Sequence, residues 1–477
     1  MSAMISLASV SPSQDEGARI FALQQAAVVR NGAPAYAERA SGLDALLRVV
    51  KRYRRQLAQA ISADFGNRSM SETDLGEFMP VIAAIKHARS HLRRWMKPQR
   101  RSVGAAFKPA SARIVYQPLG VVGVVAPWNY PLTLTLVPTI EALAAGNRVM
   151  IKPSELTPRT AELLASILGE VFSEDRVALV MGDAQVAARF SALPFDHLFF
   201  TGSTRVGRQV MATAAPNLTP VTLELGGKSP VVVCGDYPLD KAARSVAIGK
   251  LFNAGQSCVA PDYVLVHENQ VEDFASAWLD FSERMYPAIS GNSDYTSIIS
   301  DSHFERVQQM IEDAVTRGAK IVQRAAPGRI GERKIPPTIV LHAPPDALVL
   351  RDEIFAPVLP IVAYRDLDQA LAFVNARPKP LALYCFSHDH RSIKTVLNST
   401  RSGGVTVNGT LMHATQEDLA FGGVGESGMG AYHGHAGFLR LSHARGEMTM
   451  GRFNMSHLVG APYGKLTEWV TRLFVGS

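Results

Sequence analysis

The chain has 477 residues, of which 47% are hydrophobic and 19% charged, with a net charge of +7 and an isoelectric point of about 9.3. This composition excludes a disordered chain, and the length predicts two or three domains. The basic residues gather in Lys51–Arg55 and Arg93–Arg101, beside amphipathic helical patterns and without a nucleic-acid-binding module. We therefore predict solvated helix faces and no nucleic-acid partner.

Apolar residues at helical spacing predict a helix within residues 35–63 and another from about Ser71 to Met96, closed by Pro98. Residues 100–118 are polar and then β-like, which predicts an extended arm. Short apolar runs then alternate with helical patterns, as is typical of a parallel α/β sheet. The expected strands are Val121–Val125, Val149–Ile151, Val177–Met181, His197–Phe200 and Val221–Leu225, and the expected helices are Leu132–Ala145, Pro158–Val171, a short one from Asp183, and Arg205–Ala214.

The same pattern restarts after Pro230, which predicts a second α/β domain. Near the end, Phe438–Met450 reads as a strand, and Lys465–Phe474 places its apolar residues on one helical face. That face is expected to pack on a partner or on the body of the protein, with membrane-surface contact as the alternative. The expected strands of the second domain are Ser229–Val233, Tyr263–His267, Ile321–Val322, Leu381–Phe386 and Gly404–Asn408.

No segment of the sequence predicts a membrane span or a secretory signal. Met1–Leu7 has no basic residue, which makes it a poor signal peptide. Residues 114–140 are uncharged and long enough to span a bilayer, but they contain four prolines, so a strand, a loop and a helix start explain them better. Three cysteines form no disulfide framework, which favours a reducing, cytoplasmic compartment. Cys234 and Cys385 are expected to be inert, buried strand residues.

Two segments that follow predicted strands have the residue types of a nucleotide site. Gly202–Gly207 opens a helix, where small residues and free N–H groups suit a pyrophosphate, although it is not the Gly-x-Gly-x-x-Gly fingerprint. Lys152–Glu155 supplies a lysine and a carboxylate that could hold ribose hydroxyls. Taken separately, each segment is also explained by an ordinary turn or by surface residues.

Three further residues suggest covalent chemistry. Asn129 lies in a loop between Pro127 and Pro131, where its amide could donate to a developing oxyanion or simply complete a turn. Cys258 follows a Gly/Gln/Ser loop, and Glu224 lies in a glycine-flanked segment, so a thiol nucleophile with a carboxylate base is one interpretation. A buried thiol and a surface acid are the alternatives. No histidine lies near Cys258 in the sequence, so no Cys–His pair is assigned.

Taken in order, these segments resemble the aldehyde dehydrogenase superfamily from about residue 40 to 447. The resemblance rests on Pro127–Pro131, Lys152–Glu155, Phe200–Ser203, Glu224–Lys228, Gly255–Cys258, Glu353–Phe355 and Phe421–Gly428. Ala260–Val264 and Gly430–Gly434 look like the class 3 branch, and Asp294–Ile299 and Phe195–Leu198 are similar to coniferyl-aldehyde dehydrogenases. Ala356 and Ala420 depart from the pattern, because they replace a glycine and a proline that are usual there.

The resemblance implies a role for each residue. Cys258 would attack an aldehyde carbonyl, Asn129 and the Cys258 N–H would hold the oxyanion, and Glu224 would activate the water that releases the acid. The remaining candidates would bind the dinucleotide: Trp128, Lys152, Ser154, Glu155, Gly202, Ser203, Gly207, Leu225, Glu353 and Phe355. NAD is the expected cofactor, because the Glu155 carboxylate would repel a 2′-phosphate, with NADP as the alternative. No metal site is expected.

The resemblance also implies the architecture. It predicts an α/β fold with a Rossmann-type NAD-binding domain (residues 1–100 and 119–223), an α/β catalytic domain (224–410), and a small β oligomerisation arm with a C-terminal tail (101–118 and 437–477). The arm suggests a homodimer. The expected substrate is an aromatic, coniferyl-type aldehyde. The alternatives are a medium-chain aliphatic aldehyde, a CoA-acylating reaction, which Glu224 disfavours, or an inactive binding protein.

Overall fold

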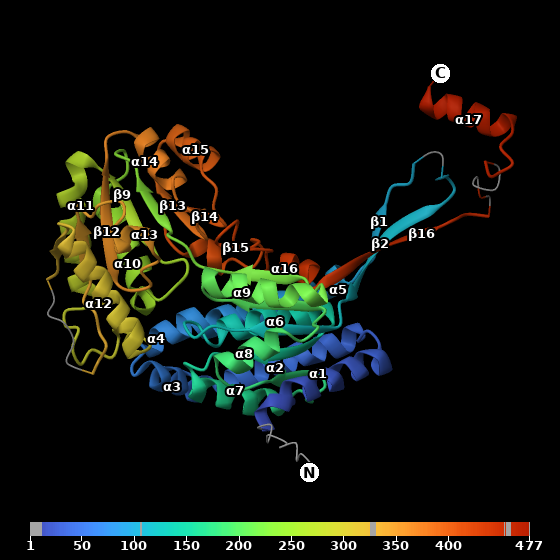
Figure 1. Ribbon diagram of the computed structural model, residues 1–477, viewed down its shortest axis with the longest axis horizontal. Helices are drawn as coiled ribbons and strands as arrows, with labels where there is room; N and C mark the ends of the chain where they lie inside the picture. Colours follow the sequence, from blue (N-terminus) through green and yellow to red (C-terminus); the bar gives the residue numbers. More distant parts are fainter. Residues whose placement is uncertain (1–11, 105–106, 325–330, 453, 455–458, 477) are drawn as a thin grey trace, which may run out of the picture.

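Three β-sheets organise the chain in the computed structural model (Figure 1). The structure describes residues 12–104, 107–324, 331–452, 454 and 459–476, so Met1–Leu7 lies outside the described residues. Two of the sheets form the cores of two α/β bodies, and the third forms an arm that extends away from both. None of the helices in these described ranges combines the length and the apolar character needed to cross a bilayer.

The first sheet has the strand order β15-β7-β6-β3-β4-β5, and all its neighbours pair in parallel except β15 with β7. The chain winds outward from β3 in one direction and then from β6 in the other, so the order reverses between β3 and β6. Ligands of open α/β sheets bind outside the carboxyl ends of strands at such a reversal. The strands are β3 Val121–Val125, β4 Arg148–Lys152, β5 Val177–Leu179, β6 His197–Thr201, β7 Val221–Glu224 and β15 Gly428–Met429.

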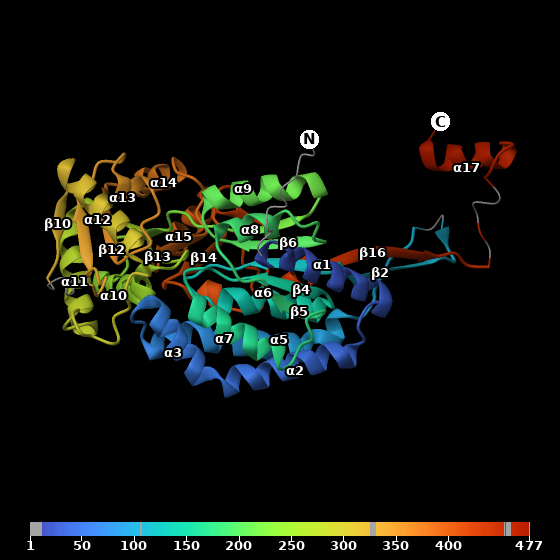
Figure 2. The same ribbon diagram turned by 60° about the horizontal axis from the view of Figure 1, so that its bottom comes forward.

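Helices cover both faces of this sheet, and the alternation along β3 shows how. Val122 and Val124 face one buried cluster, whereas Val121 and Val125 face the other. The first cluster receives α2 Tyr36–Arg52, α3 Arg54–Phe65, α5 Met79–Trp95, α6 Thr133–Ala145 and α7 Pro158–Gly169. The second receives α1 Pro12–Asn31, α8 Ala184–Ser191 and α9 Thr204–Ala214. Figure 2 shows these two helical layers on opposite sides of the sheet.

The two N-terminal helices expected from the sequence are each interrupted. The first divides at Tyr53 into α2 and α3. The second begins as α4 Met70–Thr73, passes through a π-helical turn at Asp74–Phe78 and continues as α5. Pro80 near the start of α5 has no N–H to donate, and the Gly76 carbonyl one turn earlier instead accepts a bond from Thr133 at 2.9 Å. The interruption therefore ties this helix to the loop after β3.

The second sheet has the order β10-β11-β12-β9-β8-β13-β14, parallel except at β10. Its strands are β8 Pro230–Val233, β9 Tyr263–His267, β10 Lys320–Val322, β11 Thr338–Leu341, β12 Val358–Tyr364, β13 Ala382–Phe386 and β14 Gly404–Val407. Its helices are α10 Leu239–Leu251, α11 Val271–Met285, α12 Asp301–Thr316, α13 Leu348–Arg351, α14 Leu367–Asn375 and α15 His390–Ser399. The sequence prediction missed β11 and β12, since prolines precede both and Pro360 lies inside β12, which argues against a central strand.

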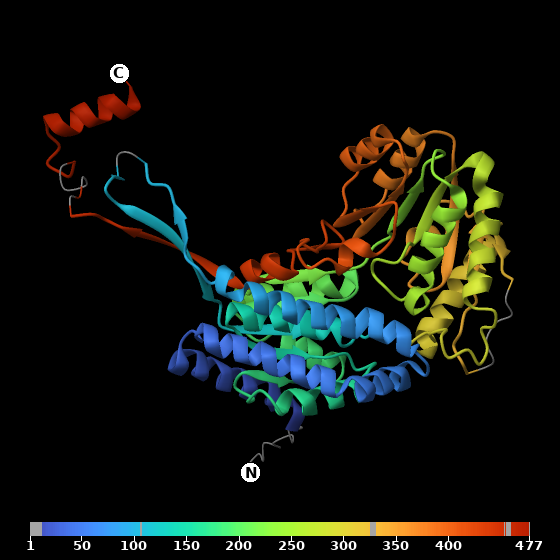
Figure 3. The same cartoon turned by 180° about the vertical axis from the view of Figure 1, so that it is seen from behind.

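The arm is a three-stranded antiparallel sheet in which β2 Ser111–Pro118 lies between β1 Gln99–Arg101 and β16 Ser442–Thr449. The expected strand Phe438–Met450 is wrong in its first part, because α16 Gly434–Arg440 packs on α5 and α6 before β16 begins. Figure 3 shows α17 Lys465–Val475 near the tip of the arm, away from the body. Its Trp469 and Phe474 are exposed, so α17 does not pack on the body of its own chain.

Candidate active site

Cys258 lies in a loop whose backbone is tightly held. Three consecutive residues before it, Asn253, Ala254 and Gly255, have φ values of 54°, 50° and 73°. A side chain at Gly255 would lie 2.5 Å from the Ala356 carbonyl oxygen, so glycine is required there. The buried Gln256 amide then donates to Asn253 and Ser297 and accepts from Ile299, which pins the loop just before the cysteine. Cys258 itself is partly exposed, unlike Cys234 and Cys385, which are buried as predicted.

The thiol of Cys258 lies in an acidic environment. The N–H groups of Cys258 and Val259 lower its pKa, but burial and the carboxyl groups of Glu353 and Glu224 outweigh them and raise the pKa to about 12. The thiol is therefore protonated at neutral pH, and it becomes nucleophilic only when this balance changes. The sequence left open what activates the thiol, and the structure shows that backbone dipoles alone do not.

Asn129 is held directly beside the Cys258 loop. Its side-chain amide donates one hydrogen bond, at 3.2 Å, to the Gln256 carbonyl, and its second N–H donates to no other group among the described residues. Its main-chain carbonyl accepts from Arg68 at 3.0 Å and from Asn253 at 3.1 Å. A fixed amide with a spare N–H beside a thiol is the arrangement that an oxyanion donor needs.

Arg68 is the supporting residue that the sequence prediction missed. It is only 1% exposed, and its guanidinium also pairs at 3.0 Å with the fully buried Glu77. The same guanidinium lies 4.9 Å from the centre of the Tyr130 ring. A lone arginine after a helix carries no sequence signal for this role, because its burial arises only when α3 and the loop after β3 come together.

Glu224 ends β7 and is 3% exposed, with no hydrogen-bond partner for either carboxylate oxygen. Burial, followed by the nearby Glu141 carboxyl group, raises the pKa of Glu224 well above its usual range. Since Glu224 also acts on the pKa of Cys258, the two groups share one site. A buried acid with a raised pKa beside a nucleophile is the type of group that general bases require.

The predicted dinucleotide residues gather along the carboxyl ends of the first sheet. Trp128 follows β3, Lys152 ends β4 with Ser154 and Glu155 after it, and Gly202 and Ser203 follow β6. Ser203 caps α9 by accepting from Val206. Lys152 is buried and donates to the Pro153 carbonyl at 2.6 Å, while Glu155 is exposed.

Glycine is needed at two of these positions because neighbouring groups approach closely. A Cβ at Gly202 would lie 2.6 Å from the Phe200 ring, and a Cβ at Gly207 would lie 2.6 Å from the Leu225 side chain. The Thr201 hydroxyl beside them is buried and has no hydrogen-bond partner. An orphaned hydroxyl next to the open N-terminus of the 11-residue helix α9 fits the pyrophosphate of a dinucleotide.

Glu353 and Phe355 approach the first sheet from the second body. Phe355, with φ of 57°, places its ring 5.5 Å from that of Trp128. The Glu353 carboxyl group lies so close to Gly226 that no side chain fits there, and burial and Asp262 raise its pKa to about 8. Arg306 donates to the Glu353 carbonyl at 3.0 Å and holds this loop in place. Sequence reasoning did not identify Arg306 or Asp262.

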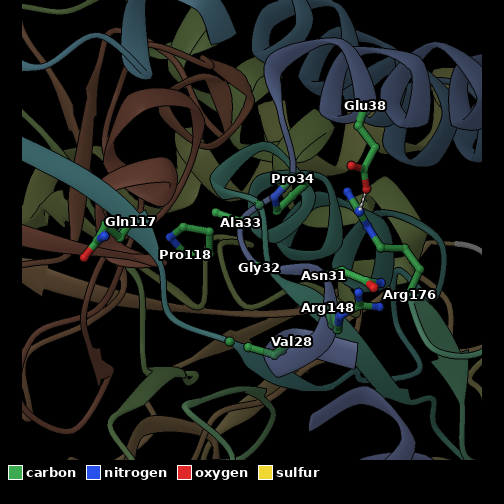
Figure 4. Close-up of a pocket in the computed structure, with 12 residues that line it drawn as sticks. Val28, Asn31, Gly32, Ala33, Pro34, Glu38, Gln117, Pro118, Arg148 and Arg176 are labelled. Atoms are coloured by element: carbon green, nitrogen blue, oxygen red, sulfur yellow. Dashed lines mark hydrogen bonds and ion pairs between the residues drawn. The ribbon is translucent and has the colours of Figure 1, made fainter. Parts of the chain in front are cut away.

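A separate cavity of about 230 Å³ lies where the arm joins the first body (Figure 4). Gln117 and Pro118 of β2 line it together with Arg148 and Arg176. Arg148 pairs with Asp175, and Arg176 pairs with Glu38, so these two charges are already balanced. None of the residues predicted for catalysis or dinucleotide binding lines this cavity.

A thiol, an asparagine amide and a buried acid, set at the edge of a nucleotide-binding type of sheet, fit an enzyme of covalent, nucleotide-dependent chemistry. The model of the aldehyde dehydrogenase family matches residues 14–445. A "Probable coniferyl aldehyde dehydrogenase" of Pseudomonas aeruginosa is 50% identical, with 96% of each chain covered. The "Coniferyl aldehyde dehydrogenase" of a Pseudomonas sp. is 46% identical, with 90% of this chain and 89% of the relative covered.

Solved structures agree. The substrate-bound Staphylococcus aureus AldH has a TM-score of 0.91 at 35% identity, covering 96% of this chain and 99% of that one. An Escherichia coli NADP-dependent enzyme has a TM-score of 0.85 at 26% identity, with 92% and 91% covered. An NAD-dependent aldehyde dehydrogenase of Sinorhizobium meliloti has a TM-score of 0.83 at 27% identity, with 92% and 88% covered. The chain belongs to the aldehyde dehydrogenase family, whose members use NAD or NADP.

Proposed function

We propose that this enzyme oxidises an aromatic, coniferyl-type aldehyde to its carboxylic acid with NAD. The observation that carries the proposal is the convergence of Cys258, Asn129 and Glu224 at one place, where Asn129 and the Cys258 loop are joined by a hydrogen bond and Glu224 acts on the thiol's pKa. The coniferyl aldehyde dehydrogenases at 50% and 46% identity support the substrate class.

Each residue has a defined task in this proposal. The Cys258 thiol gives its proton to water as its sulfur bonds to the aldehyde carbon, and the carbonyl oxygen becomes an oxyanion that the Asn129 amide and the Cys258 N–H stabilise. When bound, a nicotinamide cofactor would supply the acceptor for the hydride that leaves the same carbon, and the acyl group would remain on Cys258. A water then attacks this thioester and gives one proton to Glu224, while the carbon–sulfur bond breaks.

The assignment of Cys258 is tested by Cys258→Ser with Cys385→Ser as the matched control. We expect Cys258→Ser to form no NADH while it keeps its cofactor affinity, measured by calorimetry. The Cys385→Ser control should keep its activity. NADH formation by Cys258→Ser at the wild-type rate would show that another group is the nucleophile.

The substrate is tested by a panel of coniferyl aldehyde, benzaldehyde and hexanal, in which the highest kcat/KM is expected for coniferyl aldehyde. A strong preference for hexanal would replace the aromatic substrate with a medium-chain aliphatic one. A requirement for CoA would contradict hydrolysis by Glu224, and no NADH from any aldehyde would indicate a protein that only binds.

Glu155 supports NAD over NADP, because an exposed carboxylate at the end of β4 repels the additional phosphate of NADP. Glu155→Gln should raise kcat/KM for NADP and leave that for NAD within a few-fold. A wild-type preference for NADP would refute the repulsion argument.

The arm supports a homodimer, and the cysteines support a cytoplasmic compartment. The outer edge of β16 pairs with no strand among the described residues, and an open edge of this kind is suited to pairing with a second chain. The unpaired thiols of all three cysteines are consistent with a reducing compartment. Light scattering of the full chain should give twice the monomer mass, and a monomer would overturn this assignment.

A further inference from the structure

The segment that carries Glu353 and Phe355 forms neither a helix nor a strand. This Glu353 segment, residues 352–357, connects α13 to β12. Side chains from other parts of the second body bind its main chain, and Arg306 of α12 is one of them, because it donates to the carbonyls of Glu353 and Ile354. A segment held in this way stays in place only as firmly as the side chains that hold it. The position of Glu353 and Phe355 therefore depends on what fixes those side chains.

Lys228 holds the start of this segment and the helix before it. Its ammonium group donates to the Val349 carbonyl at 2.8 Å and to the Asp352 carbonyl at 2.9 Å, and it also donates to Asp262 Oδ2. The Lys228 side chain is only 7% exposed, so these three acceptors replace the water that a lysine otherwise binds. Lys228 thus links the main chain of the segment to the Asp262 carboxylate.

Asp262 connects this lysine to the centre of the segment. Its Oδ1 accepts from the Ile354 N–H at 3.2 Å, while its Oδ2 accepts from Lys228. Asp262 is buried, so bulk water does not compete for these bonds. Ile354 lies directly between Glu353 and Phe355 in the chain. A rotation of the Asp262 carboxylate would therefore shift the backbone that joins these two residues.

Lys250 lies beside the same carboxylate but makes no hydrogen bond. It occupies the last turn of α10 and is fully buried. Its ammonium nitrogen is 3.6 Å from Asp262 Oδ1, which is an ion-pair distance but too long for a hydrogen bond, and it has no hydrogen-bond partner among the described residues. Burial lowers the pKa of Lys250 to about 8, and Asp262 opposes this effect. Lys250 is therefore mostly charged at pH 7.

The packing of α10 does not need this charge. A buried ammonium without hydrogen bonds costs stability, and apolar side chains of similar size often replace buried charges without loss. The charge instead attracts one oxygen of Asp262, while Lys228 attracts the other. Each carboxylate oxygen thus faces its own lysine, which fixes the rotation of the carboxylate and keeps Oδ1 toward the Ile354 N–H.

We propose that two buried lysines, Lys228 and Lys250, orient Asp262, which in turn positions the Glu353 segment for hydride transfer. The inference rests on the proposed function, in which the hydride leaves the carbon that is bound to Cys258. Lys228, Lys250 and Asp262 are positioning residues, because they act through the segment. Acylation of the thiol and hydrolysis of the thioester use other residues, so loss of this support should slow the hydride step alone.

The test uses Lys250→Met in the full chain, with Lys241→Met as the matched control, because Lys241 is an exposed lysine on the same helix. An activated ester such as p-nitrophenyl acetate acylates the thiol without hydride transfer, so its hydrolysis reports the other steps. We expect NADH formation by Lys250→Met to fall about ten-fold or more, and ester hydrolysis to stay within about two-fold of wild type. Deuterium on the aldehyde carbon should slow the variant more than the wild type, because hydride transfer limits the variant's rate.

Two further measurements need no cofactor. Hydrogen exchange followed by mass spectrometry should show faster exchange at the Ile354 amide in Lys250→Met than in wild type and control. The unfolding midpoint of Lys250→Met should be unchanged or higher, because methionine removes a buried charge that has no hydrogen bond. A loss of function without a loss of stability separates positioning from general support of the fold.

Asp262→Asn keeps the size of the side chain but removes the charge that both lysines face, and it carries the test if Lys250→Met does not fold. It should show the same pattern of rates, and the double variant should be no slower than the slower single variant, because both changes act through one segment. Equal losses of NADH formation and ester hydrolysis would overturn the proposal, as would an unchanged isotope effect together with wild-type exchange at Ile354. A wild type that hydrolyses the ester but forms no NADH would instead overturn the proposed function.

Discussion

The pair of Arg68 and Glu77 offers the sharpest test of how this site is held. Arg68→Met keeps much of the buried stem but removes the 3.0 Å bonds to Glu77 and to the Asn129 carbonyl. Both side chains of the pair are fully buried. Removing one partner of a buried ion pair costs about 3–5 kcal/mol, against a total stability of roughly 5–15 kcal/mol. For a chain of 477 residues, where 1 kcal/mol shifts the unfolding midpoint by about 1 °C, the midpoint should fall by ~4 °C.

The size of this loss should depend on pH. Burial already raises the pKa of Glu77, and Arg68 lowers it. Without Arg68 the folded-state pKa rises further, so the folded variant keeps a proton that the unfolded chain releases above its ordinary value of 4.5. Stability of the variant therefore falls as pH rises above that value. Relative to the wild type, Arg68→Met should therefore lose more stability at pH 8 than at pH 5.

The double variant Arg68→Met/Glu77→Gln separates stability from catalysis. The glutamine side chain introduced in place of Glu77 is uncharged, and its carbonyl can still accept the 2.7 Å bond from the Thr133 N–H. The double variant should therefore recover most of the fall in unfolding temperature that Arg68→Met causes. The Asn129 carbonyl keeps its bond from Asn253 but still lacks the one from Arg68, so a misplaced amide should keep kcat/KM about 10²-fold low. Calorimetry and steady-state kinetics measure the two effects. A double variant that regains both would refute the role of Arg68 in positioning Asn129.

Three other predictions follow from the raised pKa values. Glu224→Gln should form one NADH per site and then stop at the thioester, which mass spectrometry of the intact chain would detect. Continuous turnover would mean that another group activates water. Without cofactor, Cys258 should react with iodoacetamide only slowly at pH 7 and faster with rising pH, because its pKa is about 12. The buried Cys234 and Cys385 should stay unlabelled. Fast labelling of Cys258 at pH 7 would contradict the acidic environment. Burial keeps Glu353 protonated until about pH 8, against an ordinary value of 4.5, so its contribution to stability falls as pH rises between these values. Glu353→Gln should remove that fall, and equal pH slopes of the unfolding midpoint in both proteins would refute it.

Local patterns predicted the five parallel strands of the first sheet, because each is a short apolar run next to a helix, but they did not predict the two-residue β15. The same reasoning failed where proline obscured the pattern, as in β12, where Pro360 occupies a central strand position opposite Val340. It also failed where a helix changes its hydrogen bonding, as at the π-helical turn before Pro80. In both cases the deciding contact comes from another part of the chain, and no local window contains it.

The candidate site divides in a similar way. Cys258 and Asn129 lie in loops and Glu224 ends β7, all with distinctive neighbours, and the resemblance could place them. Arg306 and Glu141 stand in ordinary helical sequence and Arg68 lies between α3 and α4, and only packing shows that Arg68 and Glu141 are buried and Arg306 partly buried. Their importance depends on which carbonyl or carboxyl group lies opposite them, and a single sequence does not contain that information.

The acids around Cys258 give the site a definite order of events. Glu353 and Glu224 both oppose the thiolate when they are ionised, yet burial favours a proton on each of them. A thiolate therefore forms most easily while Glu224 is still protonated, whereas deacylation needs Glu224 without its proton. The same carboxyl group must thus change its protonation state between the two half-reactions.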